Sequence, residues 1–441
     1  LMRLGETGWM IQGASLRSSK VGEQLNPQDG LYALIVRDRT ELDLRIVGSI
    51  RHVLVAPDNP QALIDRIVEP SVSLLTLTVT EKGYRPALVG GGLDMEDEGV
   101  RHDLKCPDRP KTALGFVTAG LLKRFETDAG PITLLSCDNM PENGDVVRRG
   151  VLALATQHGN RFIDWIDANC AFPSSMVDRI VPATTPEDVS DYAGALGVED
   201  RGLVKTEPFT QWVVEDWFAG RRPPLEKVGV QMTSEVSGWE NAKLRLLNGA
   251  HSAIAYLGYF AGYQFVHEAM EDPAFAHYIN RLWDEAEETL GTIDGFDPKT
   301  YRRDLSARFR NSALQHRTFQ IAMDGSQKLP QRLLRAIVWH RERGRRSPAL
   351  ELAVAAWMRW QFGRDEQGRA FVVDDPLAEQ TRSIVEAAHF APCEVAAGLC
   401  QIDSIFMPEL SNDKAWVSEL GDTLSGLITL GAQNSVEQFQ T

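Results

Sequence analysis

Three side chains that could act on a proton or an oxygen lie close together near the middle of the chain, at Lys243, Asn248 and His251. Apolar residues recur at helical spacing from Leu244 to Ile254, which predicts a helix with an apolar stripe. At about 100° per residue, His251 lies roughly 80° and Asn248 roughly 140° from Lys243, so the three project over one arc. An amine, an amide and an imidazole that converge there could move a proton and hold an oxygen. The spacing alone leaves open an ordinary alternative, in which the lysine is a solvated flank, the asparagine packs locally and the histidine belongs to the core.

Length and composition describe an ordinary globular protein with more than one core. The chain has 441 residues, of which 43% are apolar and 24% are charged. A chain of this length exceeds a single compact core, so two domains are expected. The formal net charge is −15 and no lysine–arginine run stands out, which argues against a nucleic-acid partner.

The cysteines and the apolar pattern narrow the class of protein further. Five cysteines without a Cys-x-x-Cys pair argue against a disulfide framework or a thiolate zinc site. No His/Cys/Glu cluster has metal-ligand spacing, so catalysis without a metal is predicted. The absence of a run of about 18 apolar residues and of an export signal predicts a cytoplasmic protein with no membrane partner. The cysteines are Cys106, Cys137, Cys170, Cys393 and Cys400.

The predicted secondary structure changes character at the lysine segment. Before it, strands alternate with helices, and after it the pattern is almost wholly helical. We therefore predict an α/β domain over residues 1–234 and a mainly α-helical domain over residues 235–441. In the first domain we expect strands at 9–16, 71–80 and 131–136, a hairpin at 41–52, a loop at 90–92, and helices at 60–68, 111–125 and 146–170, the last interrupted near 158–160. In the second, helices are expected to open at Asp272-Pro273, Asp297-Pro298 and Ser347-Pro348.

Beyond the lysine segment, four further stretches resemble one known family. The family signature is a lysine, then an asparagine five residues on, then a histidine three residues further, as in Lys243, Asn248 and His251. The five stretches stand in family order over nearly the whole chain, which resembles the polyol-specific long-chain dehydrogenase/reductases, often called the mannitol dehydrogenase family. The four further stretches are Thr80–Tyr84, Ser136–Pro141, Phe172–Arg179 and Thr206–Phe209.

The resemblance implies an α/β plus α architecture, with an N-terminal Rossmann-type NAD-binding domain and a C-terminal mainly helical domain. The family opens with a first strand and a glycine-rich turn that holds the cofactor pyrophosphate, and an N-terminal domain short of both is expected here. The strand at 9–16 then resembles the second Rossmann strand, whose end lies beside the adenosine ribose. Because that end offers an arginine and no carboxylate, NAD is favoured by resemblance and NADP stays open. The cofactor-binding candidates are Ser15, Arg17, Thr80, Glu81 and Lys82.

For the chemistry, the resemblance implies one role for each polar side chain. Lys243 would be the general acid or base, and Asn139 and Asn248 would donate amide hydrogens to the substrate oxygen. His251 would orient the substrate or the lysine, and Asp178 would bind a neighbouring hydroxyl. From the residues alone, Asn139 could equally be a turn former, and a buried Asp178 could pair with the arginine that follows it.

The segment from His316 to Gln331 bears on the substrate. It looks closer to the fructuronate reductases (mannonate oxidoreductases) of the family, and Gln320 stands where the polyol dehydrogenases tend to carry an arginine. A uronate has a carboxylate, which Arg317 and Lys328 could bind. The expected function is NAD-dependent interconversion of D-mannonate and D-fructuronate, by a monomer or small homo-oligomer acting on a small molecule. The alternatives are a mannitol- or arabinitol-type polyol 2-dehydrogenase, and a catalytically silent fragment or sugar-acid-binding paralogue.

Overall fold

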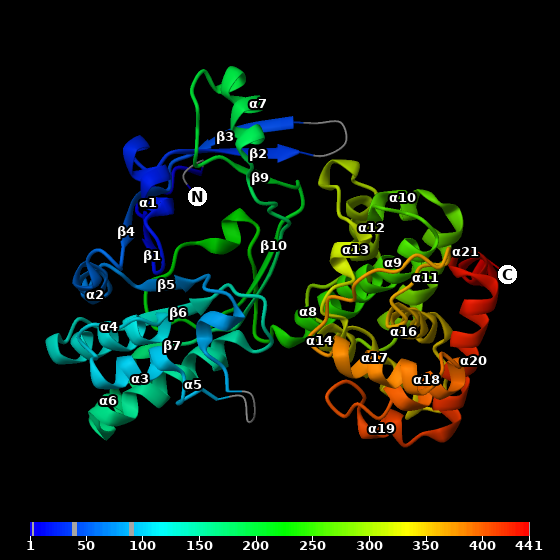
Figure 1. Ribbon diagram of the computed structural model, residues 1–441. Coiled ribbons are helices and arrows are strands. Elements are labelled where there is room, and N and C mark those ends of the chain that lie inside the picture. Colours follow the sequence, from blue (N-terminus) through cyan, green and yellow to red (C-terminus); the bar gives the residue numbers. More distant parts are fainter. Residues whose placement is uncertain (2–3, 38–41, 88–91, 441) are drawn as a thin grey trace. The chain divides into compact units, whose positions relative to one another are not determined.

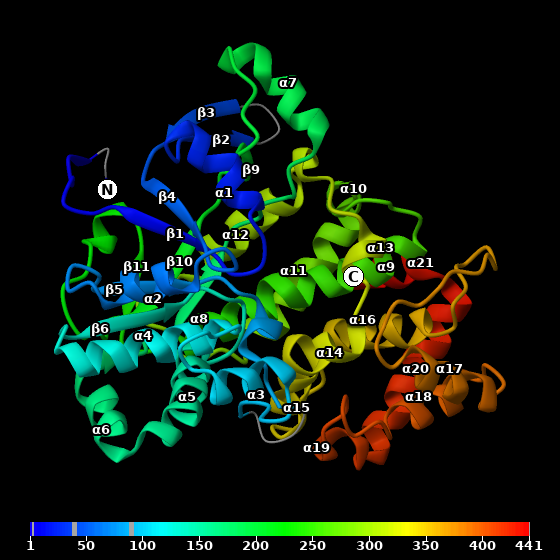
Figure 2. The same ribbon diagram turned by 60° about the vertical axis from the view of Figure 1, so that its left-hand side comes forward.

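The computed structural model describes residues 1, 4–37, 42–87 and 92–440, and it divides into two compact units, Leu1–Ser237 and Gly238–Thr441. The first unit is α/β and the second is almost wholly helical (Figures 1 and 2). The α/β plus α architecture predicted from the sequence is therefore confirmed. The predicted division at residue 234 falls just before the structural one. Part of the predicted loop, at 90–91, and the first residue of the predicted hairpin, Glu41, lie outside the described residues.

The α/β unit is built around parallel strands covered by helices (Figure 1). Its main elements are β1 (Ile11–Ser15), β4 (Ile50–Val55), α2 (Pro60–Val68), β5 (Leu74–Leu77), α4 (Ala113–Thr127), β6 (Ile132–Ser136), α5 (Asn143–Ala155), α6 (Asn160–Asn169) and β7 (Cys170–Ala171). β5, β6 and β7 form one parallel sheet, and β1 pairs in parallel with β4. Every residue of the mainly apolar β6 is buried: Ile132 and Leu134 belong to a core cluster with helical residues, and Leu135 to one with Val214 of the later strand Gln211–Glu215.

Two further sheets of three strands each belong to this unit, and the pairing in one of them differs from the prediction. Their strands are β2 (Tyr32–Arg37), β3 (Leu42–Val47) and β9 (Val204–Thr206) in one sheet, and β8 (Ser175–Asp178), β10 (Gln211–Glu215) and β11 (Gln231–Thr233) in the other. The predicted hairpin over 41–52 is wrong in its pairing, because β3 forms its hairpin with β2 and residues 50–55 form β4 beside β1. Strand propensity marks both segments as β but does not reveal their partners. The remaining helices are α1 (Lys20–Leu25), α3 (Glu98–Lys105) and α7 (Pro186–Leu196).

Arg124 of α4 is completely buried and, among the described residues, has no carboxylate partner. Its guanidinium instead donates hydrogen bonds of 2.7 to 3.3 Å to main-chain carbonyl groups of two separate segments. Burial lowers the pKa of this side chain. One arginine therefore ties the ends of α2 and α4 to the segments that lead into β5 and β6. The acceptors are the carbonyl oxygens of Ile67, Glu69, Val72, Ala129, Gly130 and Pro131.

Replacement of Arg124 by methionine should lower the free energy of unfolding of the α/β unit by about 3 kcal/mol or more, because several buried carbonyl groups lose their donor at once. Arg148→Met is a matched control, since Arg148 makes a single exposed ion pair with Asp167 that contributes about 1 kcal/mol or less. Urea unfolding followed by circular dichroism measures both. Equal unfolding midpoints for the two variants would contradict the clamping role of Arg124.

The second unit consists of helices, several of which begin at the predicted caps. They are α8 (Ser237–Ala242), α9 (Gly249–Phe260), α10 (Val266–Glu271), α11 (Pro273–Glu287), α12 (Pro298–Phe309), α13 (Thr318–Ile321), α14 (Gly325–Leu329), α15 (Arg335–Arg341), α16 (Pro348–Trp360), α17 (Ala378–Ala387), α18 (Pro392–Leu399), α19 (Pro408–Ser411), α20 (Lys414–Leu430) and α21 (Ala432–Glu437). Asp272 and Asp297 accept N–H groups at the starts of α11 and α12, each with a proline in the first turn. α16 also begins where predicted, but Ser347 makes no side-chain cap there.

α9 and α16 form the centre of this unit, where they contact each other and α11 (Figure 2). Both are buried around most of their circumference, which distinguishes a central helix from a surface helix. At Gly325, which opens α14, an added Cβ would come within 2.3 Å of the Tyr256 hydroxyl and 2.5 Å of Trp357 Nε1. Glycine therefore lets the start of α14 lie directly against both central helices.

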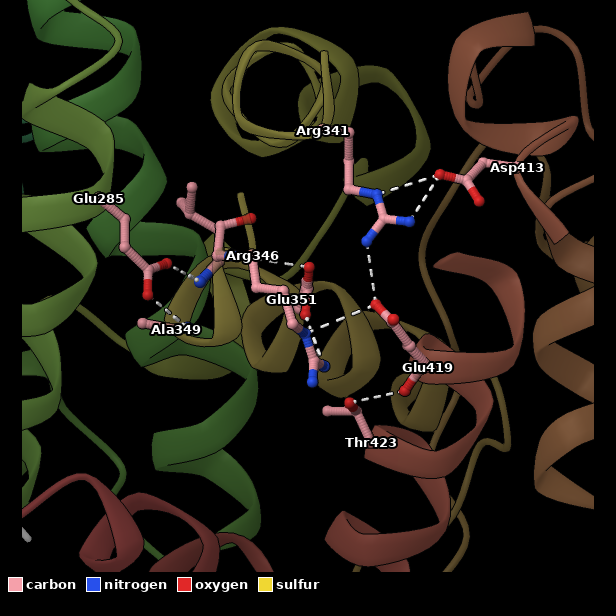
Figure 3. A network of polar contacts seen from close by, with 10 residues as sticks. Glu285, Arg341, Arg346, Ala349, Glu351, Asp413, Glu419 and Thr423 are labelled. Atoms are coloured by element: carbon pink, nitrogen blue, oxygen red, sulfur yellow. Dashed lines mark hydrogen bonds and ion pairs between the residues drawn. The ribbon is translucent and has the colours of Figure 1, made fainter. Parts of the chain in front are cut away.

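A cluster of ion pairs joins α15 and the start of α16 to α20 (Figure 3). Arg341 donates to the Asp413 carboxylate at 2.7 and 3.0 Å and to Glu419 at 3.0 Å. Arg346 lies 3.5 Å from both Glu419 and the buried Glu351. The cluster shares two guanidinium groups among three carboxylates, so each buried or half-buried charge has an opposite neighbour.

Glu285 of α11 has no such cation in hydrogen-bond contact among the described residues, and it supplies the cap that Ser347 does not (Figure 3). Its carboxylate accepts the N–H groups of Ala349 and Leu350 at 3.0 and 2.9 Å, at the positive end of α16. Burial raises the pKa of Glu285 to about 7. The nearby Glu351 carboxylate adds to this rise, and the two hydrogen bonds oppose it. The carboxyl group therefore titrates near neutrality in the folded protein.

The Glu285→Gln variant should show a weaker dependence of stability on pH. The folded protein keeps the proton up to about pH 7 while the unfolded chain releases it near 4.5, so this group's stabilisation is present at low pH and is lost as the pH rises between those values. The loss over that window is at most about 3 kcal/mol. Thermal unfolding from about pH 5 to pH 8 measures it, with Glu288→Gln as an exposed control. An unaltered pH slope in Glu285→Gln would show that Glu285 is not the titrating group.

Candidate active site

The first predicted site segment is the turn after β5, which a buried carboxylate holds in place. Thr80 has φ 65° and ψ 160°, a conformation rare for a β-branched residue and costing roughly 1–3 kcal/mol. Asp138, in the turn after β6, accepts the N–H groups of Val79 and Thr80 at 2.9 Å each and the Tyr84 hydroxyl at 2.6 Å. These three bonds offset the strain at Thr80 and fix the short turn that follows it.

The cofactor-binding candidates lie at the carboxyl ends of parallel strands. Ser15 ends β1, where its hydroxyl donates to a carbonyl of the following turn at 2.7 Å, and Arg17 is exposed in that turn. Thr80, Glu81 and Lys82 follow β5 and are also exposed. Ligands of open α/β sheets bind outside the carboxyl ends of the strands. The placement of all five residues is therefore compatible with the cofactor role expected of them.

Asn139 and Asp178 belong to two segments that one buried side chain ties together. Asn139 is exposed in the turn after β6, and Asp178 is the last residue of β8, with 7% of its surface exposed. Asn143 of α5 is completely buried, and its Nδ2 donates to the carbonyls of Asp138 at 2.9 Å and Ser175 at 2.8 Å. Its Oδ1 accepts the Ser175 N–H at 2.9 Å. The turn with Asn139 and the strand with Asp178 are thus held to each other.

The pairing of Asp178 with Arg179 that the sequence leaves open is not formed among the described residues. Arg179 Nη2 instead donates to the Glu207 carbonyl at 3.1 Å. The Glu207 carboxylate in turn accepts the Ile180 N–H at 2.8 Å. Arg179 therefore fastens the end of β8 to the stretch around Glu207, which is one of the stretches that resemble the family.

Lys243 and Asn248 lie on one continuous helical segment, but its first part is not the α-helix predicted from spacing. Residues Lys243–Asn248 form a π-helical turn between α8 and α9. The Gly249 N–H donates to the Leu244 carbonyl, five residues back, where an α-helix would use the carbonyl four residues back. A π turn contains more residues per turn, so the angle between Asn248 and Lys243 about the helix axis is smaller than the roughly 140° of an α-helix. The amine and the amide therefore project more nearly in the same direction.

His251 follows in the first turn of α9 and packs against two rings. Its ring centroid lies 4.6 Å from that of Phe309 in a stacked pair and 5.9 Å from that of His316. Nε2 is buried and, among the described residues, has no hydrogen-bond partner. Burial, with His316 and Arg308 adding to it, holds the pKa of His251 well below its ordinary value, so the imidazole is neutral near pH 7. A buried ring nitrogen without a partner suits a substrate hydroxyl.

A small pocket with polar walls lies beside the rings that surround His251. Arg308 and Asn311 each expose only 8% of their surface, and burial lowers the pKa of His316. The Asn311 Oδ1 accepts the Ala313 N–H at 3.1 Å, which fixes the amide. A guanidinium, an amide and imidazole rings surround a space with room for about one water molecule, so this is a polar corner beside His251 and not a substrate-sized pocket. The pocket is lined by Val266, His267, Arg308, Phe309, Asn311 and His316.

Arg317 and Lys328, which are predicted to bind a carboxylate of the substrate, lie in different surroundings. Arg317 is exposed, and its guanidinium lies over the Phe265 ring, 5.4 Å from the ring centroid. Lys328 is half-buried, and its ammonium donates to the carbonyl of Ile321 at 3.3 Å and to that of Met323. Burial lowers the pKa of Lys328. Arg317 therefore keeps donors for a ligand, whereas Lys328 already holds the main chain between α13 and α14.

Comparison with known proteins identifies the family. The sequence profile of the mannitol dehydrogenase Rossmann domain matches residues 2–227, and that of the mannitol dehydrogenase C-terminal domain matches residues 235–428. The chain belongs to the mannitol dehydrogenase family.

Relatives in the mannitol dehydrogenase family match this oxidoreductase over most of their own length. The uncharacterized oxidoreductase YeiQ of Escherichia coli is 40% identical over 97% of this chain and 88% of its own. The D-mannonate oxidoreductase of Escherichia coli is 39% identical over 94% of this chain and 85% of its own. The solved structure of Pseudomonas fluorescens mannitol 2-dehydrogenase in a ternary complex with NAD and D-mannitol shares 36% identity and a TM-score of 0.82, covering 100% of this chain and 89% of that one.

Reasoning from the sequence missed the residues that hold the site segments of this mannitol dehydrogenase family member. Asp138 and Asn143 stand among turn-forming residues, and in a sequence they read as turn formers. Their actual role, accepting and donating hydrogen bonds beneath the strand ends, depends on segments distant in the chain. The π turn left no trace in the apolar pattern. The family motif that contains Asp138 was the one available signal for it.

Within the described residues of this family member, no group of three or more His, Cys, Asp or Glu side chains could hold a metal ion, and no helix is both long and apolar enough to cross a membrane. The five cysteines carry free thiols. Burial raises the pKa of Cys137, which lies beside Asp138, to about 12. That thiol is therefore not a thiolate nucleophile near neutral pH.

The Asp138→Asn variant should lose roughly 2 kcal/mol of stability, because an amide offers one acceptor oxygen where the carboxylate serves three donors. Thr80→Gly is the matched opposite, since glycine adopts positive φ without strain and should leave stability unchanged or raise it. Thermal unfolding of both variants measures the difference. A loss in Thr80→Gly as large as that in Asp138→Asn would argue against strain at Thr80.

Proposed function

We propose that this chain is an NAD-dependent oxidoreductase that interconverts a secondary alcohol and a ketone on a sugar acid, with D-mannonate and D-fructuronate as the substrate pair. The observation that carries the proposal is the π turn, which brings Lys243 and Asn248 closer in direction just before a neutral His251, whose Nε2 has no partner in the described part of the chain. An amine that exchanges a proton, an amide that binds an oxygen and an imidazole that receives a hydroxyl meet the needs of this interconversion.

The strand ends of the α/β unit carry residues that fit NAD, the cofactor in the Pseudomonas fluorescens mannitol 2-dehydrogenase complex. Ser15 and Arg17 after β1, and Thr80, Glu81 and Lys82 after β5, would hold its ribose and phosphate groups. When bound, NAD supplies or accepts the hydride. Arg17 would also tolerate a 2′-phosphate, so NADP is the second cofactor to assay.

The chain's own part in the reaction is to move one proton and to stabilise charge on one oxygen. Lys243 donates a proton to the carbonyl oxygen during reduction and removes it from the hydroxyl during oxidation. Asn248 donates an amide hydrogen to that oxygen, and Asn139 is assigned the same role by family resemblance, each contributing roughly 3 kcal/mol. His251 is neutral and orients the substrate by a hydrogen bond. Asp178 accepts a hydrogen bond from a neighbouring hydroxyl.

Support for a sugar acid comes from one segment and from one relative. Residues 316–331 resemble the fructuronate reductases, and the Escherichia coli D-mannonate oxidoreductase is 39% identical to this chain. The exposed Arg317 can offer a carboxylate two parallel N–H donors, an arrangement that a neutral hydroxyl cannot match. Lys328 adds a second positive charge in the same segment.

A polyol 2-dehydrogenase is the second candidate, because the similar Pseudomonas fluorescens structure holds D-mannitol. Both candidates use the same proton chemistry, and they differ in whether the substrate carries a carboxylate. The presence of Gln320, where polyol dehydrogenases tend to carry an arginine, favours the sugar acid.

Oxidation of NADH, followed by absorbance with D-fructuronate and with D-fructose, separates the candidates. The assay is run with this chain and with a form that carries, ahead of Leu1, a first strand and glycine-rich turn of the kind that the family resemblance implies. Turnover of fructuronate supports the proposal, and turnover of fructose alone assigns a polyol dehydrogenase. If neither form oxidises NADH with either substrate but both still bind the sugar acid, the chain is a binding protein without catalytic activity.

The Lys243→Met variant should lower kcat by about 10²–10⁴-fold, because it removes the general acid or base. NADH binding, followed by fluorescence titration, should stay unchanged. Lys227→Met is the control, since Lys227 is an exposed lysine paired with Glu6. A Lys243→Met enzyme as active as Lys227→Met would exclude the acid–base role.

The Arg317→Ala variant should raise KM for D-fructuronate about tenfold and leave the kinetics with D-fructose unchanged, because the lost donors face only a carboxylate. Arg303→Ala serves as control, since Arg303 is an exposed arginine paired with Asp304. Initial-rate measurements with both substrates report the difference. Equal losses with both substrates would remove Arg317 from carboxylate recognition.

A further inference from the structure

The helical unit contains two π-helical turns that lie against each other. The first is Lys243–Asn248, and the second is Pro330–Leu334, between α14 and α15. Turns of this kind are rare, occur mostly as single turns within longer helices and are frequent at functional sites. At Gly249 the two main chains come close, because an added Cβ would lie 3.0 Å from the Arg332 carbonyl oxygen. The second turn therefore supports the first at the residue after Asn248.

The side chain of Arg332 reaches from the second turn to the first. Its Nη1 donates to the Ser252 Oγ at 3.1 Å and approaches the Asn248 carbonyl at 3.5 Å. Ser252 is buried, with 3% of its surface exposed. One guanidinium therefore contacts the main chain at Asn248 and the helix at Ser252, on either side of His251 in the sequence.

The charge of Arg332 has no carboxylate partner within the described part of the chain. Buried charges are ordinarily paired, because their desolvation is costly. Burial lowers the pKa of Arg332 to about 10, so the guanidinium stays charged near neutral pH. Its charge contributes to the lowered pKa values of both His251 and Lys328. A cation kept without a counter-ion can stabilise negative charge that develops nearby.

We propose that Arg332 is a positioning residue for the segment that carries Lys243, Asn248 and His251. It holds the main chain from which the Asn248 amide projects, and its charge adds to the burial that keeps the imidazole neutral and favours a negatively charged substrate oxygen. The inference rests on the proposed function, in which Asn248 and His251 contact the substrate. No motif of the sequence assigns Arg332 a role.

Two substitutions separate the hydrogen bonds of Arg332 from its charge. Arg332→Met removes both, whereas Arg332→Lys keeps the charge and loses the planar fork that reaches two acceptors. Arg335→Met is the matched control, because Arg335 is exposed on the helix that follows. We expect Arg332→Met to lower kcat by about tenfold or more with KM for NADH within about twofold of the parent, and Arg332→Lys to recover part of the loss.

The titration of His251, followed by NMR of ¹³C-labelled histidine, tests the effect of the Arg332 charge on the imidazole independently of catalytic activity. Arg332→Met should raise the midpoint of the His251 titration by about half a pH unit or more, and Arg332→Lys should leave it unchanged. The other groups that face His251, His316 and Arg308, are the same in both variants. A His251→Asn variant assigns the signal.

An unchanged His251 midpoint in Arg332→Met, or a kcat equal to that of Arg335→Met, overturns the proposal. If Arg332→Met does not fold, Arg332→Lys decides, and a parental kcat in that variant overturns the positioning role. A parent chain that turns over none of the substrates tells against the proposed function instead. The His251 titration then still decides whether Arg332 acts on the imidazole.

Discussion

The register of the helical segment between Lys243 and His251 is the constraint on which the proposed chemistry depends. In an uninterrupted α-helix Asn248 would project roughly 140° away from Lys243, at the far edge of the arc that they share. The π turn narrows that difference, and the lack of a side chain at Gly249 lets a second π turn pack against it. Two irregular turns, each packed on the other at the centre of a helical unit, therefore set the geometry of the site.

In the α/β unit, hydrogen bonds instead of packed turns hold the candidate site residues in position. Asp138 and Asn143 are buried beneath the strand ends, where they satisfy main-chain groups that would otherwise be left unpaired. Asp138 also keeps Thr80 in a conformation that the residue would leave on its own. Around them, Glu81 and Lys82 are exposed and open to a ligand. In both units hydrogen bonds to the main chain hold the candidate residues in place, from the buried Asp138 and Asn143 in one unit and from the half-buried Arg332 in the other.

Elements with strong local signals could be predicted from the sequence, and those that depend on distant partners could not. The helix at Pro60–Val68 agrees with its prediction at both ends, and Asp272 and Asp297 cap the helices expected of them. The partner of the strand at 42–47 was missed, because strand propensity carries no information on pairing. The family motif located Lys243, Asn248 and His251, but an extra residue in one helical turn leaves the spacing of leucines nearly unchanged. The positioning role of Arg332 could not be predicted from the sequence, since its contacts lie some 80 residues earlier in the chain.

The clamp made by Arg124 has a consequence for how the chain folds. All of its acceptors lie between Ile67 and Pro131, a continuous stretch that also contains β5 and α4 and ends where β6 begins. The contacts with Ala129, Gly130 and Pro131 lie 5 to 7 residues from Arg124 and close short loops, whereas those with Ile67, Glu69 and Val72 span 52 to 57 residues and cost more chain entropy. The clamp can nevertheless form as the chain emerges from the ribosome, before the strands that follow it have been synthesised. The later strands would then add to an edge that is already in place.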